Sequence, residues 1–191
     1  PMSKAAMLAG KHVFCEKPLA HSCAEAREIR ELSRQSKLAT QLGTQGGSTD
    51  TFRRSMEVIQ AGLLGKIREV HCWINRSFPP SAPIDTNADP IPEGLNWDFW
   101  CGPSPLLPYK SYYIAAPGAV GCLHWGRWLA FGDGHLADMG AHGLNLPWRA
   151  LKLGAPVRAT VKIAEPLRDS YPSACDFRWD FPARDGFDPV S

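Results

Sequence analysis

The first part of the chain shows helical and strand patterns in alternation. Between Ser22 and Lys37 apolar residues recur at helical spacing, and Ser22 with Glu25 three positions later forms a capping box that starts this helix. The neighbouring segments are predicted as the second half of a helix and two short strands, at Met2–Ala9, His12–Glu16 and Leu38–Leu42. Strands that alternate with helices indicate the end of a doubly wound α/β domain.

A second pattern begins after the glycine-rich turn Gly43–Gly47, which we take as the domain crossing. An apolar face predicts a helix over Thr49–Ala61, with Gly62 as its stop, and a further helix is expected over Leu136–Leu153. Alternating residues predict strands of one largely antiparallel sheet at Ile67–Ser77, Val157–Ile163 and Cys175–Phe181. We therefore expect residues 1–45 to end an α/β dinucleotide-binding domain, and residues 46–191 to form an incomplete α+β domain for substrate binding and oligomerisation.

A long stretch between Phe78 and Trp125 is rich in proline and predicts little regular structure, apart from a helical turn near Trp97–Trp100. It also holds many tryptophan and tyrosine residues, in which disordered segments are poor. We interpret it as an ordered wall, stiffened by proline, over an active site.

Composition narrows the class of protein. The chain has 191 residues, of which 44% are hydrophobic and 21% charged, and a formal net charge of +2. So small a charge gives no reason to expect binding to nucleic acid or to membranes, and no apolar run is long enough to span a bilayer. The six cysteines form no C-x-x-C pair, which favours free buried thiols, a reducing compartment and a cytoplasmic location.

Two motifs carry candidate chemistry. Glu16, Lys17 and Pro18 directly follow a predicted buried strand, and in open α/β sheets ligands bind at the carboxyl ends of strands. A lysine held there can stabilise a developing alkoxide, and a cis peptide bond before Pro18 would turn it into the crevice. Asp138 and His142, four residues apart on a predicted helix, project from one face. Each motif also has an interpretation without catalysis. Glu-Lys-Pro is a common tripeptide, and Asp138 could cap or pair locally while His142 is a half-buried histidine with its hydrogen bonds satisfied.

The two motifs lie in the segments Gly10–Ala20 and Asp138–His142. These segments resemble the Gfo/Idh/MocA family of NAD(P)-dependent sugar and inositol oxidoreductases. The resemblance implies Lys17, Asp138 and His142 as catalytic residues, with His142 as the general base. It implies a cofactor, NAD or NADP, near Glu16, Lys17, Pro18 and Gln45, and a sugar or cyclitol whose secondary hydroxyl gives up hydride. The parent protein would be a homo-oligomer. The chain lacks a G-x-G-x-x-G turn, so we expect it to be a segment cut at both ends and inactive by itself. Whether the parent protein carries an export signal, and whether it uses NAD or NADP, stays open.

Three alternatives stay open. An NAD-dependent glycosidase of the same family would oxidise its substrate only transiently, and a non-catalytic relative would bind carbohydrate without turnover. His135, Asp138 and His142 share a helix face and invite a metal interpretation. Their spacing is not that of an established zinc motif and a fourth ligand is not obvious, so we expect no metal.

Overall fold

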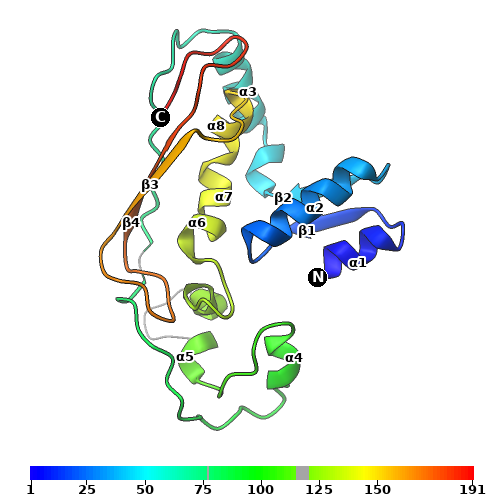
Figure 1. Ribbon diagram of the computed structural model, residues 1–191, viewed down its shortest axis with the longest axis vertical. Helices are drawn as coiled ribbons and strands as arrows, with labels where there is room; N and C mark the ends of the chain where they lie inside the picture. Colours follow the sequence, from blue (N-terminus) through cyan, green and yellow to red (C-terminus); the bar gives the residue numbers. More distant parts are fainter. Residues whose placement is uncertain (77, 115–120) are drawn as a thin grey trace.

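The computed structural model of the chain describes residues 1–76, 78–114 and 121–191, with the side chains of 121–123 left out. Figure 1 shows a small N-terminal unit on one side, a column of short helices in the middle, and a long hairpin on the far side. No helix in these ranges combines the length and the apolar character needed to cross a membrane.

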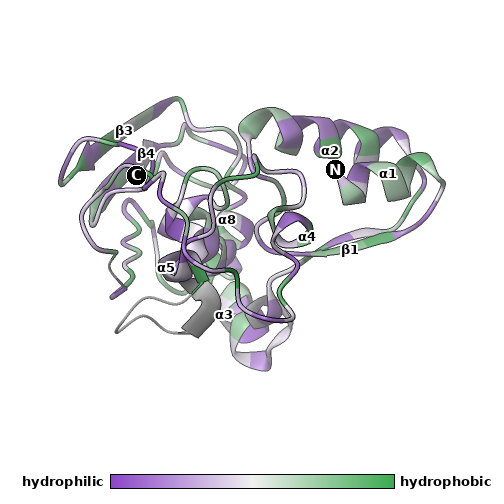
Figure 2. Cartoon of the chain, turned by 90° about the horizontal axis from the view of Figure 1, so that it is seen from below, coloured by the Kyte–Doolittle hydropathy of each residue, from purple (hydrophilic) through white to green (hydrophobic). Residues whose placement is uncertain are grey.

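The N-terminal unit has the predicted order of elements: α1 (Met2–Leu8), β1 (Val13–Glu16), α2 (Cys23–Gln35) and β2 (Thr40–Gly43). The two strands pair in parallel, with Glu16 opposite Gly43 at their carboxyl ends. Both helices lie on the same side of β1 (Figure 2). This arrangement confirms the predicted α/β unit. The carboxyl ends of its strands open toward the rest of the chain.

The start of α2 confirms one half of the predicted capping box. The Ser22 hydroxyl accepts a hydrogen bond from the backbone N–H of Glu25, at 3.2 Å. The Glu25 carboxylate reaches past the cap and accepts from the N–H of His21, at 2.9 Å. The predicted apolar positions of the helix are half-buried, and the helix ends at Gln35, two residues earlier than expected.

Beyond β2 a short 3-10 helix, η1 (Gln45–Ser48), leads into α3 (Asp50–Gln60). Thr49 caps α3 through its hydroxyl, and Gly62 follows with φ of +73°, a conformation that glycine adopts at little cost. The bounds of this helix agree with the prediction to within one residue.

The described part of the proline-rich stretch, residues 78–114 and 121–125, is built around an aromatic core. Its regular elements are α4 (Trp97–Cys101), α5 (Ser111–Ile114) and the 3-10 helix η2 (Gly121–Arg127). The buried members of this core are Trp97, Cys101, Tyr109, Tyr113 and Trp128. Because these aromatic side chains stack edge-to-face and face-to-face, the segment needs little backbone pairing to hold one shape.

The predicted helix over Leu136–Leu153 is divided into three: α6 (Gly134–Asp138), α7 (Gly140–Gly143) and α8 (Asn145–Ala150). The residues at the breaks, Met139 and Leu144, keep right-handed helical backbone angles, so the column continues in one direction (Figure 1). Glycines at 140 and 143 lower the helical propensity, and Pro147 donates no hydrogen bond, which explains why the ladder is interrupted.

The antiparallel sheet consists of β3 (Arg158–Ile163) and β4 (Cys175–Asp180), as two of the three alternating runs predicted. The third prediction, a strand over Ile67–Ser77, is wrong for residues 67–76, and Ser77 lies outside the described residues. Segment 67–76 pairs only briefly with the end of the chain, through bonds between Val70, Ser191 and Arg68. A cavity lies between part of this segment and the hairpin, and among the described residues the segment forms no ladder with β3 or β4.

Five cysteines are free, as predicted: Cys15, Cys23, Cys72, Cys101 and Cys175. Only Cys101 among them is buried, so the expectation of buried thiols is wrong for the other four. Cys122 lies outside the residues whose side chains are described.

Candidate functional site

Lys17 and Asp138 meet, although 121 positions separate them in the chain. Lys17 directly follows β1, and the peptide bond to Pro18 is cis. Asp138 is the last residue of α6. The Lys17 ammonium donates a hydrogen bond to Oδ1 of Asp138, and both side chains are mostly buried, with 22% and 34% of their surface exposed. The fold thus joins the two predicted motifs in one ion pair.

The column of helices lies against the carboxyl ends of both strands. Besides the pair with Lys17, Asn145 at the start of α8 donates to the Thr44 hydroxyl just after β2, at 3.0 Å. In a helix of 3.6 residues per turn, residues 138, 142 and 145 fall within about 60° of arc. The spacing therefore predicts that His142, which is half-buried, lies on the same face of the column as the two contacts.

The predicted cofactor residues occupy the same strand ends. The Glu16 carboxylate leans over Gly43, where an added Cβ would lie 2.6 Å from Oε2. Glycine at this position therefore leaves room for the carboxylate, which is exposed. Gln45 lies in η1 with an exposed side chain, two residues beyond β2.

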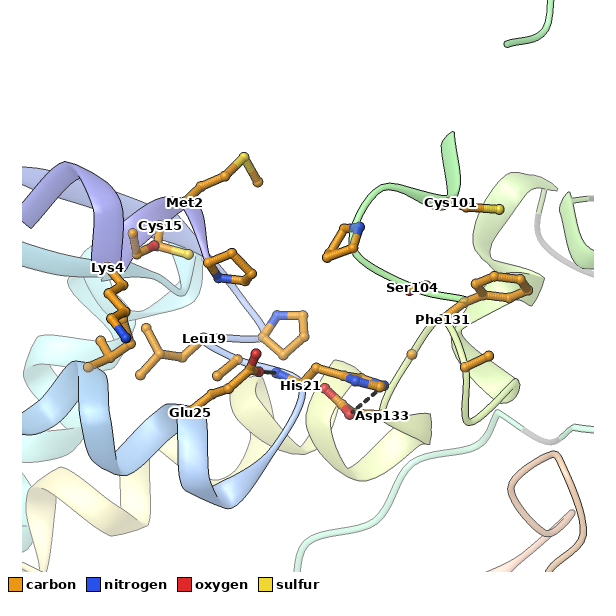
Figure 3. A pocket seen from close by; sticks show the side chains of 18 of the residues that line it. Met2, Lys4, Cys15, Leu19, His21, Glu25, Cys101, Ser104, Phe131 and Asp133 are labelled. Carbon is orange, nitrogen blue, oxygen red and sulfur yellow. Dashed lines mark hydrogen bonds and ion pairs between the residues drawn. The ribbon is translucent and has the colours of Figure 1, made fainter. Parts of the chain in front are cut away.

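A cavity of about 1100 Å³ opens between the N-terminal unit and the aromatic segment (Figure 3). Its polar groups include His21 and Asp133, whose side chains approach to 3.6 Å, and its apolar wall includes Pro18, Trp100 and Phe131. Burial raises the pKa of the Asp133 carboxyl above its ordinary value, with His21 opposing this shift. The cavity thus combines an apolar, partly aromatic wall with a few polar groups, as small-molecule sites do.

His135 takes no part in this arrangement. Its ring stacks on Phe78 with centroids 3.7 Å apart, and burial lowers its pKa. Among the residues whose side chains are described, no three His, Cys, Asp or Glu residues gather in a geometry that would hold a metal ion. The shared helix face with Asp138 and His142 therefore does not create a metal site in the described part of the chain.

Two residues of the site lack any signal in the sequence. Arg76 lies 3.6 Å from Oδ2 of Asp138. It falls within the segment Ile67–Ser77, which was predicted as a strand without a role for this side chain. Asp133 lines the cavity beside Pro18, but the sequence does not single it out, because only the arrangement of the two units brings it near His21. Conversely, Arg127 and Trp128 are buried, and Arg127 donates to the Pro80 carbonyl at 2.8 Å, which makes them structural.

Comparison with protein-family models finds a match for the N-terminal unit. Residues 1–44 match the GFO_IDH_MocA model, described as an oxidoreductase family with an NAD-binding Rossmann fold. An uncharacterized oxidoreductase of Schizosaccharomyces pombe is 33% identical over 73 residues, which are 38% of this chain and 20% of the relative. The chain therefore spans about a fifth of the length of that curated relative.

Solved structures match the whole chain in fold. GenD2 from gentamicin A biosynthesis, in complex with NAD, matches 100% of this chain and 42% of its own, with a TM-score of 0.59 and 17% identity. An NAD-binding oxidoreductase from Klebsiella pneumoniae gives 0.57 at 20% identity, over 99% of this chain and 42% of its own. An inositol dehydrogenase homologue from Azotobacter vinelandii, in complex with NAD+, has a TM-score of 0.57 and 19% identity, over 99% of this chain and 40% of its own. Residues 1–44 thus match the model of the Gfo/Idh/MocA oxidoreductase family, with its NAD-binding Rossmann fold, and the chain as a whole shares the fold of these solved structures.

Proposed function

We propose that the chain is part of an NAD(P)-dependent oxidoreductase that moves a hydride between the cofactor and a secondary hydroxyl of a sugar or cyclitol. The observation that carries this proposal is the pairing of Lys17 with Asp138 at the carboxyl end of β1. Ligands of open α/β sheets bind at this edge, and the pair brings a cation and a carboxylate to it from two separate units.

Each polar group has a task in this reaction. The Lys17 ammonium donates a hydrogen bond to the reacting oxygen and stabilises its negative charge as the C–H bond breaks. His142 accepts the hydroxyl proton, a task that suits imidazole near neutral pH. Asp138 holds Lys17 in place and keeps its ammonium directed at the site.

The strand ends also fit the cofactor. An exposed carboxylate at a strand end is an acceptor for ribose hydroxyls, and Glu16 over Gly43 supplies one. Pro18 and Gln45 would border the nicotinamide from the ends of the two strands. When bound, the cofactor supplies the hydride acceptor. In this assignment residues 1–45 complete the dinucleotide-binding domain, and residues 46–191 belong to the substrate domain.

The cavity beside Pro18 supports this substrate class. Flat aromatic faces pack against the C–H faces of ring sugars and cyclitols, while Asp133 and His21 offer partners to their hydroxyl groups. One structural neighbour of the same fold is an inositol dehydrogenase homologue from Azotobacter vinelandii with NADH and myo-inositol. This supports a hydroxylated ring as the substrate.

The test uses the full-length protein with NAD and NADP, and a panel of cyclitols, aldoses and polyols. We expect NADH or NADPH to form with at least one substrate, and Lys17→Met to reduce kcat by roughly 10²–10³-fold, the range for losing one oxyanion donor. Lys11→Met is the matched control, because Lys11 is exposed in the loop before β1. An unchanged kcat in Lys17→Met would remove Lys17 from the chemistry. Hydrolysis of aryl glycosides without net NADH would indicate a glycosidase, and sugar affinity without turnover a binding protein.

A further inference from the structure

We propose that Arg76 is a positioning residue that fixes the Asp138 carboxylate against Lys17; this inference rests on the proposed function. Each oxygen of the carboxylate has a cation as its ion-pair partner. Lys17 binds Oδ1, and an Arg76 guanidinium nitrogen lies 3.6 Å from Oδ2. The three side chains come from three separate segments of the chain, so the cluster exists only in the folded protein.

Asp138 needs such a restraint because its own element is weak. The helix α6 has only five residues, its N-cap Asp133 makes no side-chain capping bond, and Asp138 is its last residue. A carboxylate with one cationic partner can still rotate about its terminal bond. A second cation on the other oxygen fixes the plane of the group, and with it the direction in which Lys17 is drawn.

The charges of the cluster suit the reaction. Two cations share one carboxylate, so the group carries a formal excess of one positive charge beside the place where an alkoxide would develop. A lone Lys17–Asp138 pair would be neutral.

The surroundings of Arg76 favour a role in positioning Asp138 over a role in stabilising the hydrophobic core. Its side chain is 40% exposed, and it borders the cavity of about 1140 Å³ that segment 67–76 shares with Phe78 and His135. Among the described residues, the guanidinium has Asp138 as its ion-pair partner, so its removal takes this one contact from the carboxylate. Elsewhere, Arg53 forms a similar arginine–aspartate pair with Asp50 within α3, at 3.0 Å and far more exposed. This pair provides a matched control.

The kinetic experiment compares Arg76→Met, Arg76→Lys and Arg53→Met in the full-length protein. We expect Arg76→Met to lower kcat by roughly tenfold with little change in KM, because a small misplacement of catalytic groups lowers the rate and not binding. Arg76→Lys should restore part of the loss, and Arg53→Met should behave as wild type. In the Asp138→Asn background, Arg76→Met should cause no additional loss. Additive losses would overturn the inference, since Arg76 would then act independently of Asp138.

A second measurement does not depend on turnover. The rate of Lys17 acetylation by acetic anhydride, followed by peptide mass spectrometry, should rise in Arg76→Lys by roughly twofold, because this variant keeps the positive charge near Asp138 but loses the planar guanidinium that restrains the carboxylate. Acetylation of Lys11 should not change. An unchanged or slower rate at Lys17 would overturn the positioning role. If the wild type oxidises no substrate but Lys17 still becomes more reactive, the proposed function fails while the role of Arg76 stands.

Discussion

At the scale of single residues, Asp89 shows how the proline-rich segment is held. Its carboxylate accepts from the Lys110 ammonium at 2.8 Å and from the Ser111 backbone N–H at 2.9 Å. Lys110 is buried and also lies 3.1 Å from Asp85. These bonds tie the two ends of a loop that carries α4 and the aromatic core.

This cluster predicts a dependence of stability on pH. The bonds from Lys110 and Ser111 lower the pKa of Asp89 from its ordinary 3.8 to about 2. The unfolded chain therefore takes up the proton first, and the stabilisation is lost as pH falls from about 4 through about 2. The melting temperature of Asp89→Asn should start lower than that of wild type and fall less over this interval. Parallel curves for the two proteins would contradict the assignment.

The sequence predicts the chemistry of the site better than its geometry. Lys17 and Asp138 could be picked out because residue type and position after a strand or on a helix are local properties. Arg76 and Asp133 could not, because their partners lie 62 and 112 positions away and only the folded chain brings them together. The place of His142 beside this pair stays a prediction.

At the scale of elements, periodicity succeeds where an element is stabilised locally. Helices α2 and α3 carry side-chain caps at their first turns, and both were predicted closely. Segment 67–76 has a clear alternation, but alternation defines a face and does not provide a partner strand. The helix over 136–153 was broken by its own glycines, a cost that a pattern of apolar residues does not show.

The start of α6 depends on one glycine. Gly134 has φ of +66°, and an added Cβ would lie 2.8 Å from the Tyr171 ring. We expect Gly134→Ala to lower the free energy of unfolding by about 2 kcal/mol, from backbone strain and overpacking together. Gly154→Ala is the control, because nothing lies within 4 Å of its added Cβ and its φ is outside the left-handed region. Urea denaturation should separate the two variants, and equal midpoints would refute the expectation.

At the scale of the whole molecule, the two units are joined through polar contacts. The column of helices meets the N-terminal unit at His21–Asp133, Lys17–Asp138 and Thr44–Asn145. A parallel strand pair thus faces a helical column along its carboxyl edge. This arrangement is the physical basis for proposing that a hydroxylated substrate and a dinucleotide meet there.

The most direct test of this account follows the hydrogen itself. The full-length protein is given a substrate that carries deuterium on the carbinol carbon, and the nicotinamide product and the solvent are analysed by mass spectrometry. The account predicts that the deuterium is found on the reduced nicotinamide, and that Lys17→Met lowers the rate without changing where the label goes. Deuterium released to water, with an unlabelled cofactor, would contradict hydride transfer at this site.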